Sequence, residues 1–224
     1  MSRTLSLPAG CPVVLALIGV CALAFVGQNT SGGALTNAGV LFGPAVQQGQ
    51  WWRLVSSALL HGGLLHLGLN LFMLYALGGP LERGVGSLRF ALVAAGALAG
   101  GSLAVMLFDW GQPTLGASGI VMGVAAAFGV ALHAQGADPR QHPTFGLVVL
   151  NLAIPLLLPG AGISFWGHLG GAVGGVIIAW LVIWRPLRAH RSGGSGATRT
   201  STGVAAVALL VAAAAASAHL GGLI

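Results

Sequence analysis

Long apolar stretches, separated by short segments rich in glycine, proline and polar residues, follow one another along the whole chain. With a window of about 19 residues, seven of these stretches are long enough, or nearly so, to cross a bilayer as helices. We expect them near residues 12–27, 57–78, 88–108, 115–134, 144–159, 163–184 and 203–222. The pattern therefore predicts an all-α polytopic membrane protein without a soluble domain at either end.

The segments between these stretches contain strong turn signals. The signals are Gly78-Gly79-Pro80, Gln112-Pro113, Asp138-Pro139, Pro159-Gly160 and a Ser/Gly/Thr-rich segment over 192–202. We interpret the last of these as a linker. The expected organisation is a six-helix core over residues 1–191, the linker over 192–202 and a seventh transmembrane helix over 203–224.

Charge distribution predicts how the helices are oriented. The nine basic residues are all arginines, and eight of them lie at the helix ends of one side, whereas Arg53 lies on the other. Because cytoplasmic loops retain arginine, we expect the amino terminus in the cytoplasm and the carboxyl terminus outside, in a bacterial plasma membrane. Alternatively, the first helix is a signal peptide that follows Arg3, which leaves the remaining topology unchanged. The basic isoelectric point thus indicates membrane topology, and nucleic acid is not an expected partner.

Composition also excludes several kinds of chemistry. The only acids are Glu82, Asp109 and Asp138, too few for a multi-metal cage and poorly suited to paired-carboxylate catalysis. Cys11 and Cys21 lie roughly 15 Å apart if their stretch is helical, so they do not pair with each other. No metal and no cofactor is expected.

Polar residues inside the apolar stretches are the candidates for function, because each is costly in hydrocarbon. They are His61, His66 and Asn70 in the second stretch, Ser118 within Gly116-Ala117-Ser118-Gly119, and His168 in the sixth. All lie near the outer ends of their expected helices. His66 and Asn70 are four residues apart and share one helix face. They can serve a common site or simply bond to neighbouring helices.

The glycine spacing favours a shared site. Gly119 with Gly123, and Gly171 with Gly175, form small-xxx-small faces that allow close helix packing. Such packing would bring Ser118 within hydrogen-bond reach of His168, the arrangement that activates a hydroxyl nucleophile. The Ser118 N–H, with His66 and Asn70, would then stabilise an oxyanion. Asp109 is interpreted first as a solvated helix-end charge, with orientation of His168 as the alternative.

With these residues the chain resembles the rhomboid family of intramembrane serine proteases over essentially its whole length. The motifs are Trp52-Arg53, the set His61, His66 and Asn70, the sequence Gly116-Ala117-Ser118-Gly119, and His168 with Gly171 and Gly175. The resemblance implies a Ser118–His168 dyad without an obligatory acid, an oxyanion hole of His66, Asn70 and the Ser118 amide, and transmembrane proteins as substrates. It also implies that Trp52 and Arg53 anchor the first loop, residues 28–56, in the lipid interface.

Two positions leave questions open. Met122 stands where the family often has an aromatic residue stacked on the histidine, which makes the orientation of His168 less certain. His61 either lines the entry of the hydrolytic water or supports the structure. Two other functions remain as alternatives: a catalytically inactive rhomboid-like protein that binds or dislocates transmembrane helices, and a channel or transporter. The sequence predicts no oligomeric state.

Overall fold

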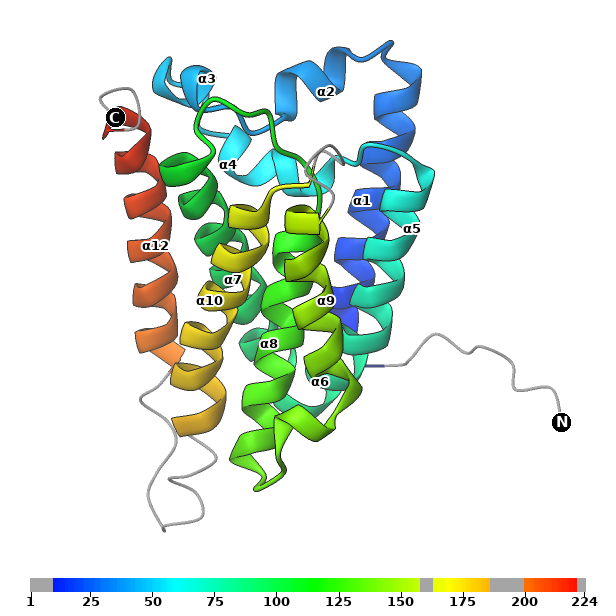
Figure 1. Ribbon diagram of the computed structural model, residues 1–224, viewed down its shortest axis with the longest axis vertical. Helices are drawn as coiled ribbons and strands as arrows, with labels where there is room; N and C mark the ends of the chain where they lie inside the picture. The colour runs from blue at the N-terminus through cyan, green and yellow to red at the C-terminus, as the bar shows by residue number, and fades with distance from the viewer. Residues whose placement is uncertain (1–9, 158–162, 186–199, 221–224) are drawn as a thin grey trace, which may run out of the picture.

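The computed structural model describes residues 10–157, 163–185 and 200–220, which form a bundle of helices running alongside one another (Figure 1). The helices are α1 (Pro12–Thr30), α2 (Ala34–Gly39), α3 (Gly43–Gln47), α4 (Arg53–Ser56), η1 (Ser57–Leu59), α5 (Leu64–Met73), η2 (Leu74–Gly78), α6 (Gly79–Val85), α7 (Ser87–Phe108), α8 (Ser118–Ala134), η3 (Pro139–Gln141), α9 (Pro143–Leu157), α10 (Phe165–Ala179), η4 (Trp180–Trp184) and α12 (Thr200–Leu220). The all-α polytopic class expected from the apolar pattern is confirmed.

Four helices are long and apolar enough to cross a membrane by length and composition: Pro12–Thr30, Leu64–Val85, Ser87–Phe108 and Phe165–Trp184. Three shorter apolar helices, Ser118–Ala134, Pro143–Leu157 and Ser201–Ser217, lie among them. Each of the seven predicted stretches therefore contains a helix. The predicted linker falls mostly within 186–199, outside the described residues.

The second membrane helix differs from its predicted bounds. It begins at Leu64 rather than near residue 57, and it continues through Gly79 and Pro80 to Val85. The sequence pattern predicts a break at Pro80 because proline lacks an N–H. Instead, the wide π turn η2 precedes it, with the Gly79 N–H donating to the Tyr75 carbonyl. Pro80 lies in the first turn of α6, where a missing N–H is tolerated, and the helix continues, so the expected break at Gly78-Gly79-Pro80 is wrong.

Glu82 in α6 binds the amino-terminal end of α1. Glu82 is buried, and its two carboxylate oxygens accept hydrogen bonds from the Val13 N–H at 3.0 Å and the Val14 N–H at 2.9 Å. These are N–H groups in the first turn of α1, which have no partners within their own helix. A carboxylate is favourable there because the helix dipole is positive at that end.

Close glycine contacts hold the centre of the bundle together. A Cβ at Gly175 would lie 2.6 Å from the Gly123 carbonyl carbon, and one at Gly100 would lie 2.5 Å from the Gly170 carbonyl oxygen. The predicted packing of α8 on α10 through their glycine faces is therefore confirmed. The second glycine face of α10 packs on α7, a partner that the sequence pattern did not indicate.

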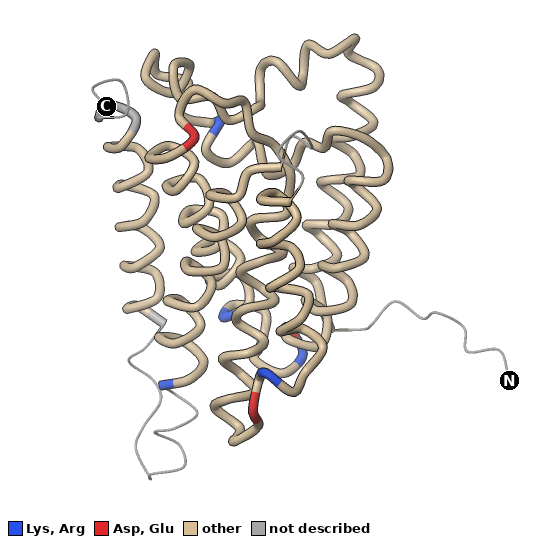
Figure 2. The backbone as a smooth tube through the Cα atoms, in the orientation of Figure 1, with Lys and Arg blue, Asp and Glu red and all other residues tan. Residues whose placement is uncertain are grey.

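The described charged residues lie at the two ends of the bundle (Figure 2). Arg53 and Asp109 lie at the loop end, which we define as residues 31–63 and 109–117. The opposite, arginine end contains Arg83, Arg89, Arg140 and Arg185. This separation is the one expected from the sequence, and the cytoplasmic location of the arginine end stays a prediction. Arg3, Arg188, Arg191 and Arg199 lie outside the described residues.

The loop end is more ordered than predicted. The sequence pattern predicts a non-helical connection over residues 28–56, but α2, α3 and α4 lie within this segment. Hydrogen bonds in both directions between Leu41 and Thr114 join it to the segment before α8. At the same end, Ala214 of α12 is buried in a cluster with Leu41, Val46, Leu54, Val105 and Met106. The seventh helix thus supports the first loop while it packs along α7.

Candidate active site

Ser118 is the first residue of α8, at the loop end of the bundle. The preceding turn needs Gly116, whose φ of 125° is one that side chains rarely adopt. Its N–H donates to the Ser57 carbonyl at 2.9 Å, which ties the turn to η1. A Cβ on Gly116 would also lie 2.7 Å from His66 Cε1. Glycine therefore permits both the turn and the close approach of the His66 imidazole.

The start of α8 is suited to negative charge. The first N–H groups of any helix lack acceptors within the helix, and they combine with the helix dipole to bind anions. Ser118 has its hydroxyl and its main-chain N–H at this position. A nucleophile and an oxyanion donor can thus come from one residue.

His168 lies in the first turn of α10, and a serine fixes where that helix begins. Ser164 Oγ accepts a hydrogen bond from the Gly167 N–H at 3.0 Å, which caps the helix. The same hydroxyl donates to Asp109 Oδ2 at 2.5 Å. Asp109 therefore reaches the start of the His168 helix through Ser164. Asp109 ends α7 and is half-buried, so the first interpretation gives its place correctly but omits the bond to Ser164, and Asp109 does not contact the imidazole directly.

The hydrogen bonds of His168 determine which ring nitrogen is basic. Its Nδ1 lies 2.9 Å from the main-chain carbonyl of Asn151 in α9. Because a carbonyl only accepts, Nδ1 must carry the proton and Nε2 must carry the lone pair. Nε2 is buried and has no hydrogen-bond partner among the described residues. The ring is thus arranged to take a proton at Nε2.

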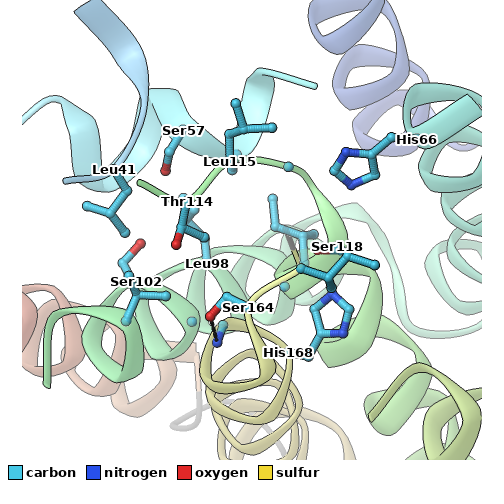
Figure 3. Close-up of a pocket in the computed structure, with 18 residues that line it drawn as sticks. Leu41, Ser57, His66, Leu98, Ser102, Thr114, Leu115, Ser118, Ser164 and His168 are labelled. Atoms are coloured by element: carbon cyan, nitrogen blue, oxygen red, sulfur yellow. Dashed lines mark hydrogen bonds between the residues drawn. The ribbon is translucent and has the colours of Figure 1, made fainter. Parts of the chain in front are cut away.

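Ser118 and His168 line one small cavity of about 50 Å³, together with His66. In Figure 3 the Ser118 side chain lies between the two imidazoles. The cavity exceeds the roughly 10–15 Å³ that one water needs, so it has room for a water or a small group. Gly116 and Gly119, which flank Ser118 in the sequence motif, also line the cavity.

Asn70 does not line this cavity. It is buried, and its Nδ2 donates to the His66 carbonyl at 2.9 Å, one turn earlier in the same helix. One of its two amide hydrogens is thereby occupied. The structure thus brings Ser118, His168 and His66 together and leaves Asn70 directed at its own helix.

His61 lies in the turn before α5, beside His66. The ring centroids are 5.2 Å apart in an edge-to-face arrangement. The Gln28 side-chain amide holds the His61 backbone, since its Nε2 donates to the His61 carbonyl and its Oε1 accepts from the His61 N–H. The Nε2 of His61 is buried without a partner among the described residues. Burial, and secondly the neighbouring His66, lower the pKa of His61 to about 4. A histidine of this kind is neutral at physiological pH.

The remaining predicted site residues are spread around the core. Met122 is buried one turn beyond Ser118, and Gly171 and Gly175 pack against α8. Trp52 is 54% exposed, consistent with contact to the lipid interface. Arg53, by contrast, is 7% exposed and donates to Gln50 Oε1 at 2.8 Å and to the Val40 carbonyl at 2.7 Å. Arg53 therefore stabilises the first loop through internal hydrogen bonds and does not extend toward lipid.

Two residues that position His168, Ser164 and Asn151, were not predicted from the sequence. Ser164 carries a recognisable signal, since a serine just before an apolar helix is a typical N-cap. Asn151 contacts His168 through its main-chain carbonyl, which every residue has, so the residue type does not indicate this contact.

Replacing Ser164 with alanine is expected to destabilise the protein by about 1 kcal/mol, the usual effect of losing an N-cap. Unfolding in detergent, followed by circular dichroism, measures this change. Ser87→Ala is the matched control, since Ser87 begins α7 without being its N-cap residue. Equal losses for the two variants would contradict a capping role for Ser164.

Comparisons with known proteins identify the family of the chain. A family model described as a Rhomboid domain matches residues 48–185. Rhomboid protease GluP of Bacillus subtilis (strain 168) is 33% identical over 154 residues, covering 68% of this chain and 30% of that protein. Rhomboid-type serine protease 2 of Emericella nidulans is 32% identical over 147 residues, covering 61% and 28%. RHOMBOID-like protein 5 of Arabidopsis thaliana is 31% identical over 159 residues, covering 68% and 50%. The match spans less than a third of the first two relatives.

Proposed function

Because the chain belongs to the rhomboid family, we propose that it is an intramembrane serine endopeptidase that hydrolyses peptide bonds in or near transmembrane segments. Several of its relatives are named as proteases, which supports this activity at the level of the family. The catalytic residues proposed are Ser118 and His168, with transmembrane proteins of the surrounding bilayer as substrates. No cofactor enters the proposed reaction.

One observation carries the proposal. A buried imidazole presents an unpartnered Nε2 in the same small cavity as a serine at the start of a helix. An unpartnered buried polar atom is costly, so its presence needs an explanation. A base waiting for the hydroxyl proton of Ser118 is such an explanation.

In the proposed reaction, His168 Nε2 takes the proton of Ser118 as the serine oxygen attacks the scissile carbonyl carbon. The Ser118 N–H and the His66 side chain stabilise the oxyanion, and Asn70 joins them after its side chain turns away from the His66 carbonyl. His168 then gives its proton to the leaving amine as the C–N bond breaks. Finally, water loses a proton to His168 as it attacks the acyl ester, and His168 returns that proton to the Ser118 oxygen as the ester C–O bond breaks.

Two further expectations belong to this proposal. Residues 1–191 act as the catalytic core, with 203–224 as an accessory helix that supports the first loop. The loop end, which contains the site, faces away from the cytoplasm. A substrate helix must also unwind locally, because the carbonyls of a membrane helix are hydrogen-bonded within it.

The test must distinguish Ser118 from the other serines of the cavity. We expect the wild type to react with a fluorophosphonate probe and to cleave a single-span model substrate in liposomes, whereas Ser118→Ala does neither. Ser102→Ala is the control, because its hydroxyl already donates to the Leu54 carbonyl at 2.7 Å. Labelling that persists in Ser118→Ala would assign the nucleophile elsewhere. A wild type that binds the substrate helix without turnover would indicate an inactive rhomboid-like protein.

A further inference from the structure

A proline lies inside the helix that contacts His168. Pro155 is a buried residue of α9, two positions before Leu157, the last described residue of that helix. Proline has no main-chain N–H, so it cannot make the usual bond to the carbonyl four residues earlier. In α9 that carbonyl belongs to Asn151. The sequence therefore removes the regular helical donor from one particular main-chain oxygen.

That oxygen is the one that contacts the imidazole. His168 Nδ1 lies 2.9 Å from the Asn151 carbonyl, and His168 is only 5% exposed. The Asn151 side chain does not compete for the contact, since its Nδ2 donates to the Leu147 carbonyl at 2.8 Å. The main chain of α9 thus supplies the acceptor, in a place where water has little access.

The three acids of the chain have other partners. Glu82 caps α1, Asp138 pairs with Arg140 at 3.0 Å, and Asp109 accepts from Ser164. In serine proteases of the triad type, a buried carboxylate holds the histidine in the tautomer whose Nε2 is basic. A freed carbonyl can do the same, because it also accepts only from a protonated Nδ1.

We propose that Pro155 is a positioning residue: by removing the helical N–H, it leaves the Asn151 carbonyl to hold His168 Nδ1–H and to direct the Nε2 lone pair into the cavity of Ser118. The catalytic consequence rests on the proposed function. The tautomer itself does not, because it is a property of the protein without substrate. Helix α9 therefore provides the orienting group as part of its main chain.

The decisive measurement is the tautomer of His168. The full chain in detergent micelles, labelled with ¹⁵N at its seven histidines, gives ring-nitrogen signals that separate the two neutral tautomers. The His168→Gln spectrum assigns the signals. We expect the wild type to show a protonated Nδ1 and a basic Nε2 for His168. A protonated Nε2 in the wild type would overturn the proposal, whatever the variants do.

Pro155→Ala restores the N–H, which then competes for the Asn151 carbonyl. We expect both tautomers of His168 to appear in this variant, with kcat about tenfold lower and KM unchanged, as for the loss of one hydrogen bond. Alanine is the best helix former, so the variant is expected to fold. Its unfolding curve in detergent checks this.

Pro143→Ala is the matched control, because Pro143 is the first residue of the same helix, where its missing N–H frees no carbonyl inside the helix. It should keep the wild-type tautomer and kcat. The proposal fails if folded Pro155→Ala keeps a single tautomer, or if Pro143→Ala changes the spectrum equally. Absence of proteolysis in every sample would instead refute the proposed function and leave the tautomer result standing.

Discussion

Replacing His168 with glutamine is expected to lower kcat by at least about 10⁴-fold, and adding Ser118→Ala to the same chain should cause little further loss. A nucleophile and its base act as one unit, so removing either removes nearly the whole contribution of both. Glutamine keeps a buried polar side chain of similar length, which limits the effect on folding. Cleavage of a fluorogenic single-span substrate, measured for both single variants and the double variant, tests the expectation.

His133→Gln controls for the loss of an imidazole. His133 lies in the last turn of α8, at the arginine end, far along the helix from Ser118. Its replacement should leave kcat close to that of the wild type. Losses that multiply in the double variant would show that Ser118 and His168 act independently, contrary to a dyad.

Gly175→Ala is expected to destabilise the protein by about 1–3 kcal/mol and to abolish proteolysis. The added methyl group would meet the Gly123 main chain, and overpacking of this kind has that range of effects. Alanine gains about 1 kcal/mol of helix propensity over glycine, so the cost of the contact exceeds the measured net loss by about that amount. Separation of α8 from α10 would also move Ser118 away from His168. Unfolding in detergent and the cleavage assay measure the two consequences.

Gly68→Ala is the corresponding control, because a Cβ on this helical glycine of α5 meets nothing within 4 Å. It should gain stability through propensity and keep its activity. A Gly175→Ala variant that became more stable, as Gly68→Ala should, would contradict a tight α8–α10 contact.

The apolar pattern predicted the fold class because membrane helices are recognisable from length and hydropathy. The helix ends were predicted less well, since they depend on local hydrogen bonding. Pro80 is an instance: Gly78-Gly79-Pro80 is a strong turn signal, but Pro80 lies in the first turn of α6 and the helix continues to Val85. The first loop was similarly misjudged because short helices held by Arg53 contacts have no long apolar pattern.

In the candidate site, too, the side chains could be predicted from the sequence, whereas the main-chain and packing contacts could not. Residue type and spacing indicated Ser118, His168 and His66 as candidates, because polar side chains and glycine faces are visible in the sequence itself. Asn151 was missed because its carbonyl is common to all residues, and only the proline four positions later distinguishes it. The sequence placed Asp109 correctly at the same end of the bundle as the site. Its contact with Ser164 was not predicted, because that contact depends on packing between α7 and α10.

The carboxylate of Glu82 has a mechanical consequence for the first helix. Only 11% of the residues in the most apolar window of α1 are fully buried, so one side of this helix faces away from the bundle. Apolar contacts alone would let such a helix slide along its axis, but a shift of one turn, about 5.4 Å, would strip Glu82 of both its donors. The carboxylate thus sets the depth of α1 at one end, while the Gln28 side chain holds the other end to the main chain of His61.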